Sequence, residues 1–196
     1  MSYAMKPLSC DPTKLKGLSE KLIVSHYENN YGGAVKRLNA INDYLANLDF
    51  ATAPVFMING LKREELIATN SMILHEVYFD SLGGNGGEPS GSLRGLIERD
   101  FTSIAKWQAQ FAAMGKALGG GSGWVLLTYS ARDRKLINQW ASDHAHTLAG
   151  ATPILALDMY EHSYHMDYGA KAAAYVDAFM NNINWGSVGN VYEQCA

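Results

Sequence analysis

The sequence predicts an α+β fold, in which an N-terminal helical hairpin is followed by a small three-stranded antiparallel sheet flanked by helices. Between residues 20 and 82, apolar residues recur mostly at steps of three and four, which is the period of an amphipathic helix. After residue 123 come three short apolar runs bounded by turn residues, a pattern typical of strands. Helices followed by clustered strands, without regular alternation, indicate the α+β class.

Composition and charge exclude several classes of protein. The 196 residues suffice for one or two small domains with a hydrophobic core. The formal net charge is -3 and no block of Lys and Arg stands out, so a nucleic-acid partner has no electrostatic support. No run approaches the roughly 20 apolar residues of a membrane span, and the start lacks the apolar core of a signal peptide. Cys10 and Cys195 form neither a disulfide framework nor a metal-ligand spacing, which favours a reducing compartment. We expect a cytoplasmic protein.

The first helix of the hairpin follows an extended arm over residues 1–18. Ser19 is a plausible N-cap, because its side-chain oxygen can accept a hydrogen bond from the first helical turn. His26 lies on the apolar stripe of this helix and is expected to point inward. Gly32 and Gly33 fall in the middle of the helix, where each costs about 1 kcal/mol against Ala. We expect a kink, a bulge or a break there.

A connection over residues 49–60 precedes the second helix, predicted over residues 62–82. His75 again lies on the apolar side of its helix. Two antiparallel helices that each carry one inward histidine can clamp a metal ion. The alternative is a pair of core histidines bonded to backbone groups.

The glycine-rich loop over residues 83–91 is the best domain boundary. We expect an N-terminal helical hairpin domain (1–88) and a C-terminal α/β domain (89–196). The elements expected in the second domain are helices over 93–101 and 104–118, strands over 124–129, 135–140 and 153–158, and a closing helix over 168–184.

The third strand delivers a carboxylate and an imidazole close together. Asp158 stands at its end and His162 follows four residues later. An oxygen and a nitrogen aimed at one point are a common way to hold a first-row metal. The alternative is that Asp158 caps a helix and that His162 is an ordinary buried histidine.

Four sequence motifs resemble the iron/manganese superoxide dismutase family. Asp158 to Tyr164 reads D-M-Y-E-H-S-Y, against the family's D-x-W-E-H-x-Y. Gly86 to Gly91 reads G-G-E-P-S-G, and Gly121 to Trp124 reads G-S-G-W. His26 falls where the family has its first metal histidine. The four occur in order along nearly the whole chain, which is therefore identified as a divergent member of the family.

The resemblance implies a ligand set and a reaction. The metal ligands would be His26, His75, Asp158 and His162, and the cofactor one iron or manganese ion per subunit. Three imidazoles and one carboxylate suit either metal, although zinc and copper would also accept them. The reaction would convert superoxide to dioxygen and hydrogen peroxide, with the metal cycling between its trivalent and divalent states. Two alternatives are a related iron or manganese redox protein with another substrate, and a non-enzymatic scaffold with this fold.

The resemblance also implies residues around the ligands. The family places a glutamine against the metal-bound solvent from one of two positions, which here read Ser71 and His144. Serine cannot fill that role, so His144 is the expected solvent partner, although His144 and His146 could also be a polar loop pair. Glu161 would cross a dimer interface to His162 of the partner subunit, which implies a homodimer or a tetramer.

The chain departs from the family near the expected entrance. The gateway tyrosine reads Ala34, and the histidine and tyrosine that usually pair there read Asn30 and His165. Tyr31, Asn30 or His165 could rebuild a relay, and Tyr31 and His165 are therefore kept as catalytic candidates. Around the metal, Trp124 is retained, whereas the other tryptophans and the entrance arginine are replaced. Their positions read Phe79, Leu126, Tyr160 and Ala172. Ala34 and the Gly32-Gly33 pair near the mouth predict a wider, more flexible opening.

Overall fold

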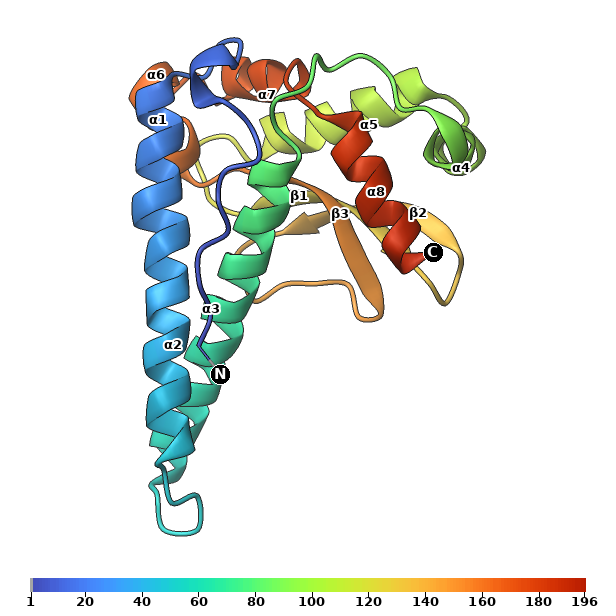
Figure 1. Cartoon of the computed structure of the whole chain (residues 1–196). Helices are drawn as coiled ribbons and strands as arrows, with labels where there is room; N and C mark the ends of the chain where they lie inside the picture. Colours follow the sequence, from blue (N-terminus) through green and yellow to red (C-terminus); the bar gives the residue numbers. More distant parts are fainter. Residues whose placement is uncertain (1) are drawn as a thin grey trace.

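The computed structural model describes residues 2–196 and confirms the α+β fold, with a long helical hairpin beside a compact α/β half (Figure 1). The N-terminal arm runs along the hairpin and contains one short 3-10 turn. The helical elements of this half are η1 (Pro12–Lys14), α1 (Glu20–Ser25), the π-helical turn η2 (His26–Tyr31), α2 (Gly32–Ala46) and α3 (Val55–Asp80).

The first helical rod is continuous but contains a π-helical turn. Ser19 caps it as predicted, since its hydroxyl accepts a hydrogen bond from the backbone N–H of Leu22. The expected irregularity takes the form of η2, which begins at His26 and ends directly before Gly32. A Cβ on Gly32 would lie 3.0 Å from the sulfur of Met5, so this glycine lets the N-terminal arm pack closely. Such π-helical turns are frequent at functional sites.

The second helix is longer than predicted. Helix α3 begins at Val55, so the expected connection over residues 49–60 was wrong in its second half. Pro54 is extended rather than helical, and a proline disfavours the helical conformation in the residue before it, so the helix does not begin earlier. A Cβ on Gly60 would meet nothing within 4 Å. Its cost is therefore only about 1 kcal/mol, which a helix this long tolerates.

The second half of the chain contains the three-stranded antiparallel sheet. Its strand order is β2-β1-β3, with β1 in the centre. The elements are α4 (Gly91–Phe101), α5 (Ile104–Ala117), β1 (Trp124–Ser130), β2 (Lys135–Ala141), β3 (Ala151–Asp158), η3 (Glu161–Ser163), α6 (His165–Tyr168), α7 (Ala172–Met180) and α8 (Trp185–Cys195).

The closing helix was predicted incorrectly, because residues 168–184 do not form one helix. Helix α7 ends at Met180, and α8 forms beyond it. Between them, the buried side chain of Asn182 bonds both the N–H and the C=O of Lys16. Asn184 then caps α8 by accepting a hydrogen bond from the N–H of Ser187. Two asparagine side chains thus bind backbone groups that a continuous helix would leave unused.

Contacts within the sheet fix the position of the end of β3. Every residue of β1 is buried, and Trp124 lies opposite Asp158 in the register. Gly123 has φ +125, and a Cβ there would lie 2.1 Å from the carbonyl oxygen of Ala141, so only glycine fits this close approach. Its own carbonyl accepts a hydrogen bond from Met159 at 2.9 Å. The residue after Asp158 is therefore fixed to the residue before Trp124.

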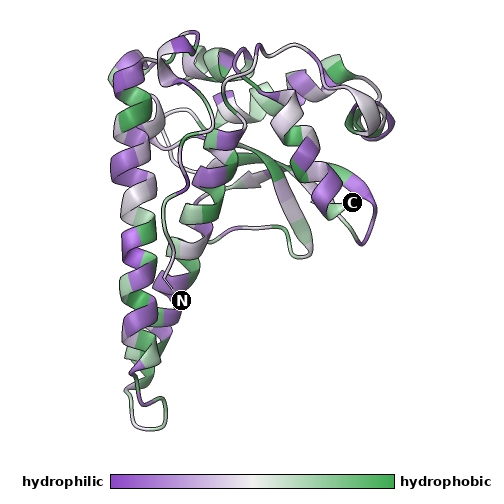
Figure 2. Cartoon of the chain, in the orientation of Figure 1, coloured by the Kyte–Doolittle hydropathy of each residue, from purple (hydrophilic) through white to green (hydrophobic). Residues whose placement is uncertain are grey.

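Hydrophobic residues run along the central strands of the sheet, whereas the hairpin helices mix hydrophobic and hydrophilic residues (Figure 2). The buried hydrophobic residues of both halves form one core. Helix α3 packs on β3, and α5 packs on β1. None of the helices in residues 2–196 offers the uninterrupted apolar length that a bilayer crossing demands.

Candidate metal centre

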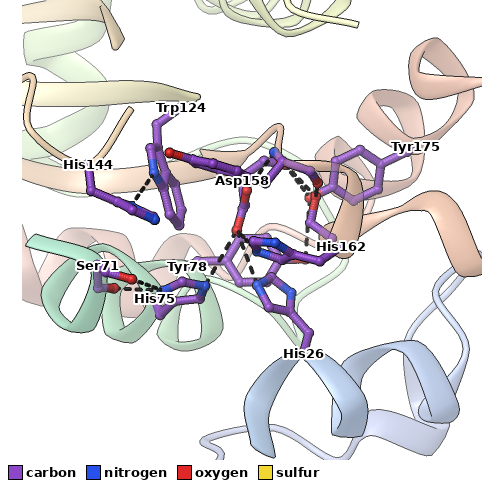
Figure 3. A network of polar contacts seen from close by, with 11 residues as sticks. His26, Ser71, His75, Tyr78, Trp124, His144, Asp158, His162 and Tyr175 are labelled. Atoms are coloured by element: carbon purple, nitrogen blue, oxygen red, sulfur yellow. Dashed lines mark hydrogen bonds and ion pairs between the residues drawn. The ribbon is translucent and has the colours of Figure 1, made fainter. Parts of the chain in front are cut away.

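Four side chains from four separate elements converge on one point (Figure 3). His26 begins the π-helical turn, His75 lies in α3, Asp158 ends β3, and His162 lies in the 3-10 turn that follows. One nitrogen or oxygen atom from each lies within 4.8 Å of all the others. The structure thus brings together the four residues expected to be ligands.

All three imidazoles direct Nε2 toward the same carboxylate oxygen. Oδ2 of Asp158 lies 3.1 Å from Nε2 of His26, 3.2 Å from Nε2 of His162 and 3.6 Å from Nε2 of His75. The other oxygen, Oδ1, accepts a hydrogen bond from the backbone N–H of Tyr160 at 2.8 Å. One oxygen is thereby held in place and the other faces the histidines.

Two of these nitrogens are buried without a hydrogen bond. Within residues 2–196, Nε2 of His26 and Nε2 of His75 have no hydrogen-bond partner. An unsatisfied buried polar atom typically costs about 1–3 kcal/mol. Nδ1 of His75 donates to the backbone carbonyl of Ser71 at 2.6 Å, which leaves the lone pair of its Nε2 directed at the cluster. Coordination of a metal ion would satisfy both atoms, so the residues fit such an ion.

The protonation states suit metal binding. Burial lowers the pKa of His26, and it lowers the pKa of His75 to about 3. Burial alone would raise the pKa of Asp158, but the close imidazoles of His162 and His26 hold it well below its usual range. The donor set consists of imidazole nitrogens and an anionic oxygen, with no thiolate, and it suits iron or manganese better than a structural zinc site.

The backbone of Asp158 is held by residues that the sequence analysis missed. Its carbonyl oxygen accepts hydrogen bonds from the hydroxyl of Tyr175 at 2.8 Å and from the hydroxyl of Ser163 at 2.9 Å. Such outer contacts orient a ligating side chain. No motif signals them, because they act on a backbone atom rather than on the carboxylate.

His144 lies beside the cluster in a fixed orientation. Nε1 of Trp124 donates a hydrogen bond to Nδ1 of His144 at 3.0 Å. Burial lowers the pKa of His144, so the ring is neutral and carries its proton on Nε2. The ring of Tyr160 stacks on His144 at 4.8 Å and on His162 at 5.4 Å, measured between ring centroids. His146, by contrast, is exposed and bonds Asp143.

A cavity of about 200 Å³ leads from the surface to the cluster. It reaches His75, His144 and His162, and its outer part includes Asn30 and Ala34. The two other catalytic candidates do not line it. Tyr31 is buried, and its hydroxyl donates to Glu76 at 3.1 Å and accepts from the N–H of Lys6 at 2.8 Å. His165 is exposed at the start of α6.

Comparison with known proteins assigns the family. Residues 89–191 match the model of the iron/manganese superoxide dismutase C-terminal domain. The chain is 80% identical over 185 residues to an iron superoxide dismutase of Cupriavidus metallidurans, which covers 94% of this chain and 93% of the relative. This chain belongs to the iron/manganese superoxide dismutase family.

More distant superoxide dismutases carry either metal in their names. An iron superoxide dismutase of Aquifex aeolicus is 34% identical over 93% of this chain and 88% of its own. Manganese superoxide dismutase 1 of Halobacterium salinarum is also 34% identical, over 99% of this chain and 96% of its own. The predicted family is confirmed. The qualification "divergent" is not needed, because a relative shares four-fifths of its residues.

The positions that depart from the superoxide dismutase pattern are mostly packed rather than open. Phe79 is buried and stacks on the His75 ring, with 6.3 Å between the centroids. Leu126 is fully buried in β1. Ala172 is buried as well, and it lies 3.2 Å from where a Cβ on Gly119 would stand. Glu161, beside the ligand His162, is exposed.

Proposed function

We propose that this protein converts superoxide to dioxygen and hydrogen peroxide at one iron or manganese ion held by His26, His75, Asp158 and His162. The convergence of these four donors, two of them otherwise unsatisfied, carries the proposal. The family named above supports the reaction. The identity of 80% to an iron superoxide dismutase supports iron as the metal.

The chain's own residues position the reaction. A bound iron or manganese ion would supply the redox chemistry, in which an electron from one superoxide is passed to a second. In balance, two superoxide ions and two protons yield one dioxygen and one hydrogen peroxide, and both protons go to the reduced superoxide. His144 lines the cavity, Trp124 packs against the ring of His75, and Tyr160 stacks on the rings of His144 and His162. Because Trp124 occupies Nδ1 of His144, the Nε2–H of His144 is the donor that the ring offers to oxygen in the cavity.

Metal analysis and superoxide decay test the proposal together. We expect close to one iron per chain, and a decay of superoxide far faster than that given by the same concentration of free iron. Metal-loaded protein no faster than free iron would reject the activity. Faster turnover of peroxide than of superoxide would favour the alternative of another redox substrate. Protein unable to take up iron or manganese would favour a scaffold.

We propose that the protein is a homodimer, or a tetramer built from such dimers, in which Glu161 bonds His162 of the partner subunit. Glu161 is exposed beside His162. Among the described residues, Nδ1 of His162 has no hydrogen-bond partner, whereas the corresponding nitrogen of His75 is bonded to Ser71. A second copy would supply that partner. Light scattering of the protein and of Glu161→Ala gives the mass; an unchanged, monomeric mass for both would reject the interface.

We also propose a cytoplasmic location and a two-domain division, into residues 1–88 and 89–196. Cys10 and Cys195 are both free thiols, which supports a reducing compartment. The family's C-terminal domain model begins its match at residue 89, which supports the boundary. Cell fractionation tests the location. Limited proteolysis tests the boundary, with first cleavage expected within residues 83–91.

A further inference from the structure

The cavity that leads to the metal centre contains one fixed charge among its described lining residues. Three histidines, His75, His144 and His162, line its inner end. Asparagine, serine and apolar side chains make up nearly all of the remaining wall, and no carboxylate lines it. The exception is Arg37, whose guanidinium is charged at any ordinary pH.

The charge of Arg37 is not neutralised by a neighbour. In residues 2–196, no carboxylate oxygen lies within 4.0 Å of its guanidinium, although other arginines of the chain are paired. Arg94 bonds both Glu88 and Glu98, and Arg99 bonds Asp100. Arg37 is exposed to solvent and is free to act on an ion in the cavity.

The helix places Arg37 over the opening. Asn30, Ala34 and Arg37 follow one another at steps of four and three, so they lie on one face of the helix. Gly33 and Ala34, the residues one turn before Arg37, carry almost no side chain and also line the cavity. The long side chain of Arg37 therefore borders an opening that its own helix does not obstruct.

We propose that Arg37 guides superoxide into the cavity, as a positioning residue that does not touch the metal or the reacting oxygen. This inference rests on the function proposed above. The chain as a whole has a net charge of -3, which repels an anionic substrate at long range. An unpaired cation at the mouth reverses that field locally and raises the rate of encounter. Both products are neutral, and Arg37 has no charge interaction that would retain them.

The test compares variants at two ionic strengths. At about 10 mM salt, where charges act over about 30 Å, we expect Arg37→Gln to lower kcat/KM for superoxide about two- to fivefold. Arg37→Glu lowers it further, and Arg37→Lys retains most of it. Near 1 M salt, where the screening length is about 3 Å, the difference between the wild type and Arg37→Gln disappears. Metal content and kcat stay unchanged throughout.

Arg132 provides a matched control. It is exposed in the turn between β1 and β2, has no ion pair within the described residues, and does not line the cavity. Arg132→Gln changes the net charge equally, so we expect the wild-type salt profile. If Arg37→Gln behaves like Arg132→Gln, or if its loss persists at high salt, the guiding role is rejected.

A binding measurement separates this inference from the function itself. Azide is a small monoanion whose binding to the ferric protein can be followed by absorbance without turnover. At low salt, we expect its Kd to rise about two- to fivefold in Arg37→Gln and not in Arg132→Gln. Azide binding that depends on Arg37, in a protein without dismutase activity, would reject the proposed function and keep the anion guide. Dismutase activity in a protein whose azide binding does not depend on Arg37 would keep the proposed function and reject the guiding role of Arg37.

Discussion

The bottom of the cavity and its mouth are built in different ways. At the bottom, Asp158 is held by hydrogen bonds from Tyr160, Tyr175 and Ser163, His75 is held by Ser71, and three of the four donors are buried. At the mouth, the side chains of Asn30 and Arg37 make no hydrogen bond or ion pair within residues 2–196, and Ala34 has no polar side chain. The comparison indicates that the geometry of the donors is fixed from within the fold. Access to them depends instead on surface size and charge, which can change without disturbing the metal.

Removing the central carboxylate is expected to have the largest effect. Asp158→Asn keeps the shape of the side chain but loses its charge, so iron content and dismutase activity should fall about 100-fold or more, beyond the 10–100-fold typical of an outer contact. Metal analysis and superoxide decay measure both. Asp177→Asn, which removes an exposed carboxylate paired with Lys116, is the control and should retain both. Full iron content in Asp158→Asn would contradict the assigned donor set.

Removing the metal should lower the stability of the folded protein. Chelation leaves the Nε2 atoms of His26 and His75 buried and unsatisfied. Loss of an ion present at 1,000 times its Kd removes about 4.1 kcal/mol, so the apo protein should melt about 8–16 °C lower. Calorimetry of the apo and reloaded forms measures this. Equal melting temperatures would mean that the cluster holds no ion in the folded protein.

The tryptophan behind His144 tests whether the orientation of that ring matters. Trp124→Phe removes the only described hydrogen bond to Nδ1 of His144, so the proton is no longer confined to Nε2. We expect about a tenfold lower kcat with iron content retained, measured by superoxide decay at saturating substrate. His144→Gln, which keeps an N–H donor, should retain more activity than His144→Ala. Equal activity in these two variants would argue against a donor role.

A hydroxyl that holds the backbone of Asp158 should affect stability more than catalysis. Tyr175→Phe leaves the carbonyl of Asp158 with the Ser163 hydroxyl as its remaining side-chain donor. The expected loss is about 1–2 kcal/mol, a melting temperature lower by about 2–8 °C, with activity within about twofold of the wild type. Tyr129→Phe serves as a control, since no hydrogen bond to its hydroxyl is described. A large loss of activity in Tyr175→Phe would show that the backbone contact tunes the metal as well.

The same contrast explains what the sequence could predict. The four donors were found because motif and apolar periodicity agree at those positions: His26 and His75 lie on buried faces, and Asp158 ends a buried strand. Local patterns failed where an asparagine side chain replaced backbone bonds, as at Asn182, or where a loop-like segment extended a helix, as after Pro54. Arg37 was missed because nothing in a helical pattern shows which cavity an exposed residue borders.

The smallest effect is expected at Tyr31, which sequence reasoning placed in the catalytic relay and the structure places behind His75. Its hydroxyl forms hydrogen bonds with Glu76 and with the backbone N–H of Lys6, and Tyr31 does not line the cavity. Tyr31→Phe should therefore cost about 0.5–1 kcal/mol of unfolding free energy, because the Lys6–Glu76 ion pair remains. The kcat and kcat/KM for superoxide should be unchanged. A selective fall in kcat, with normal stability and iron content, would return Tyr31 to the catalytic path. Such a result would also show that Tyr31, behind His75, contributes to catalysis together with the N–H donor of His144.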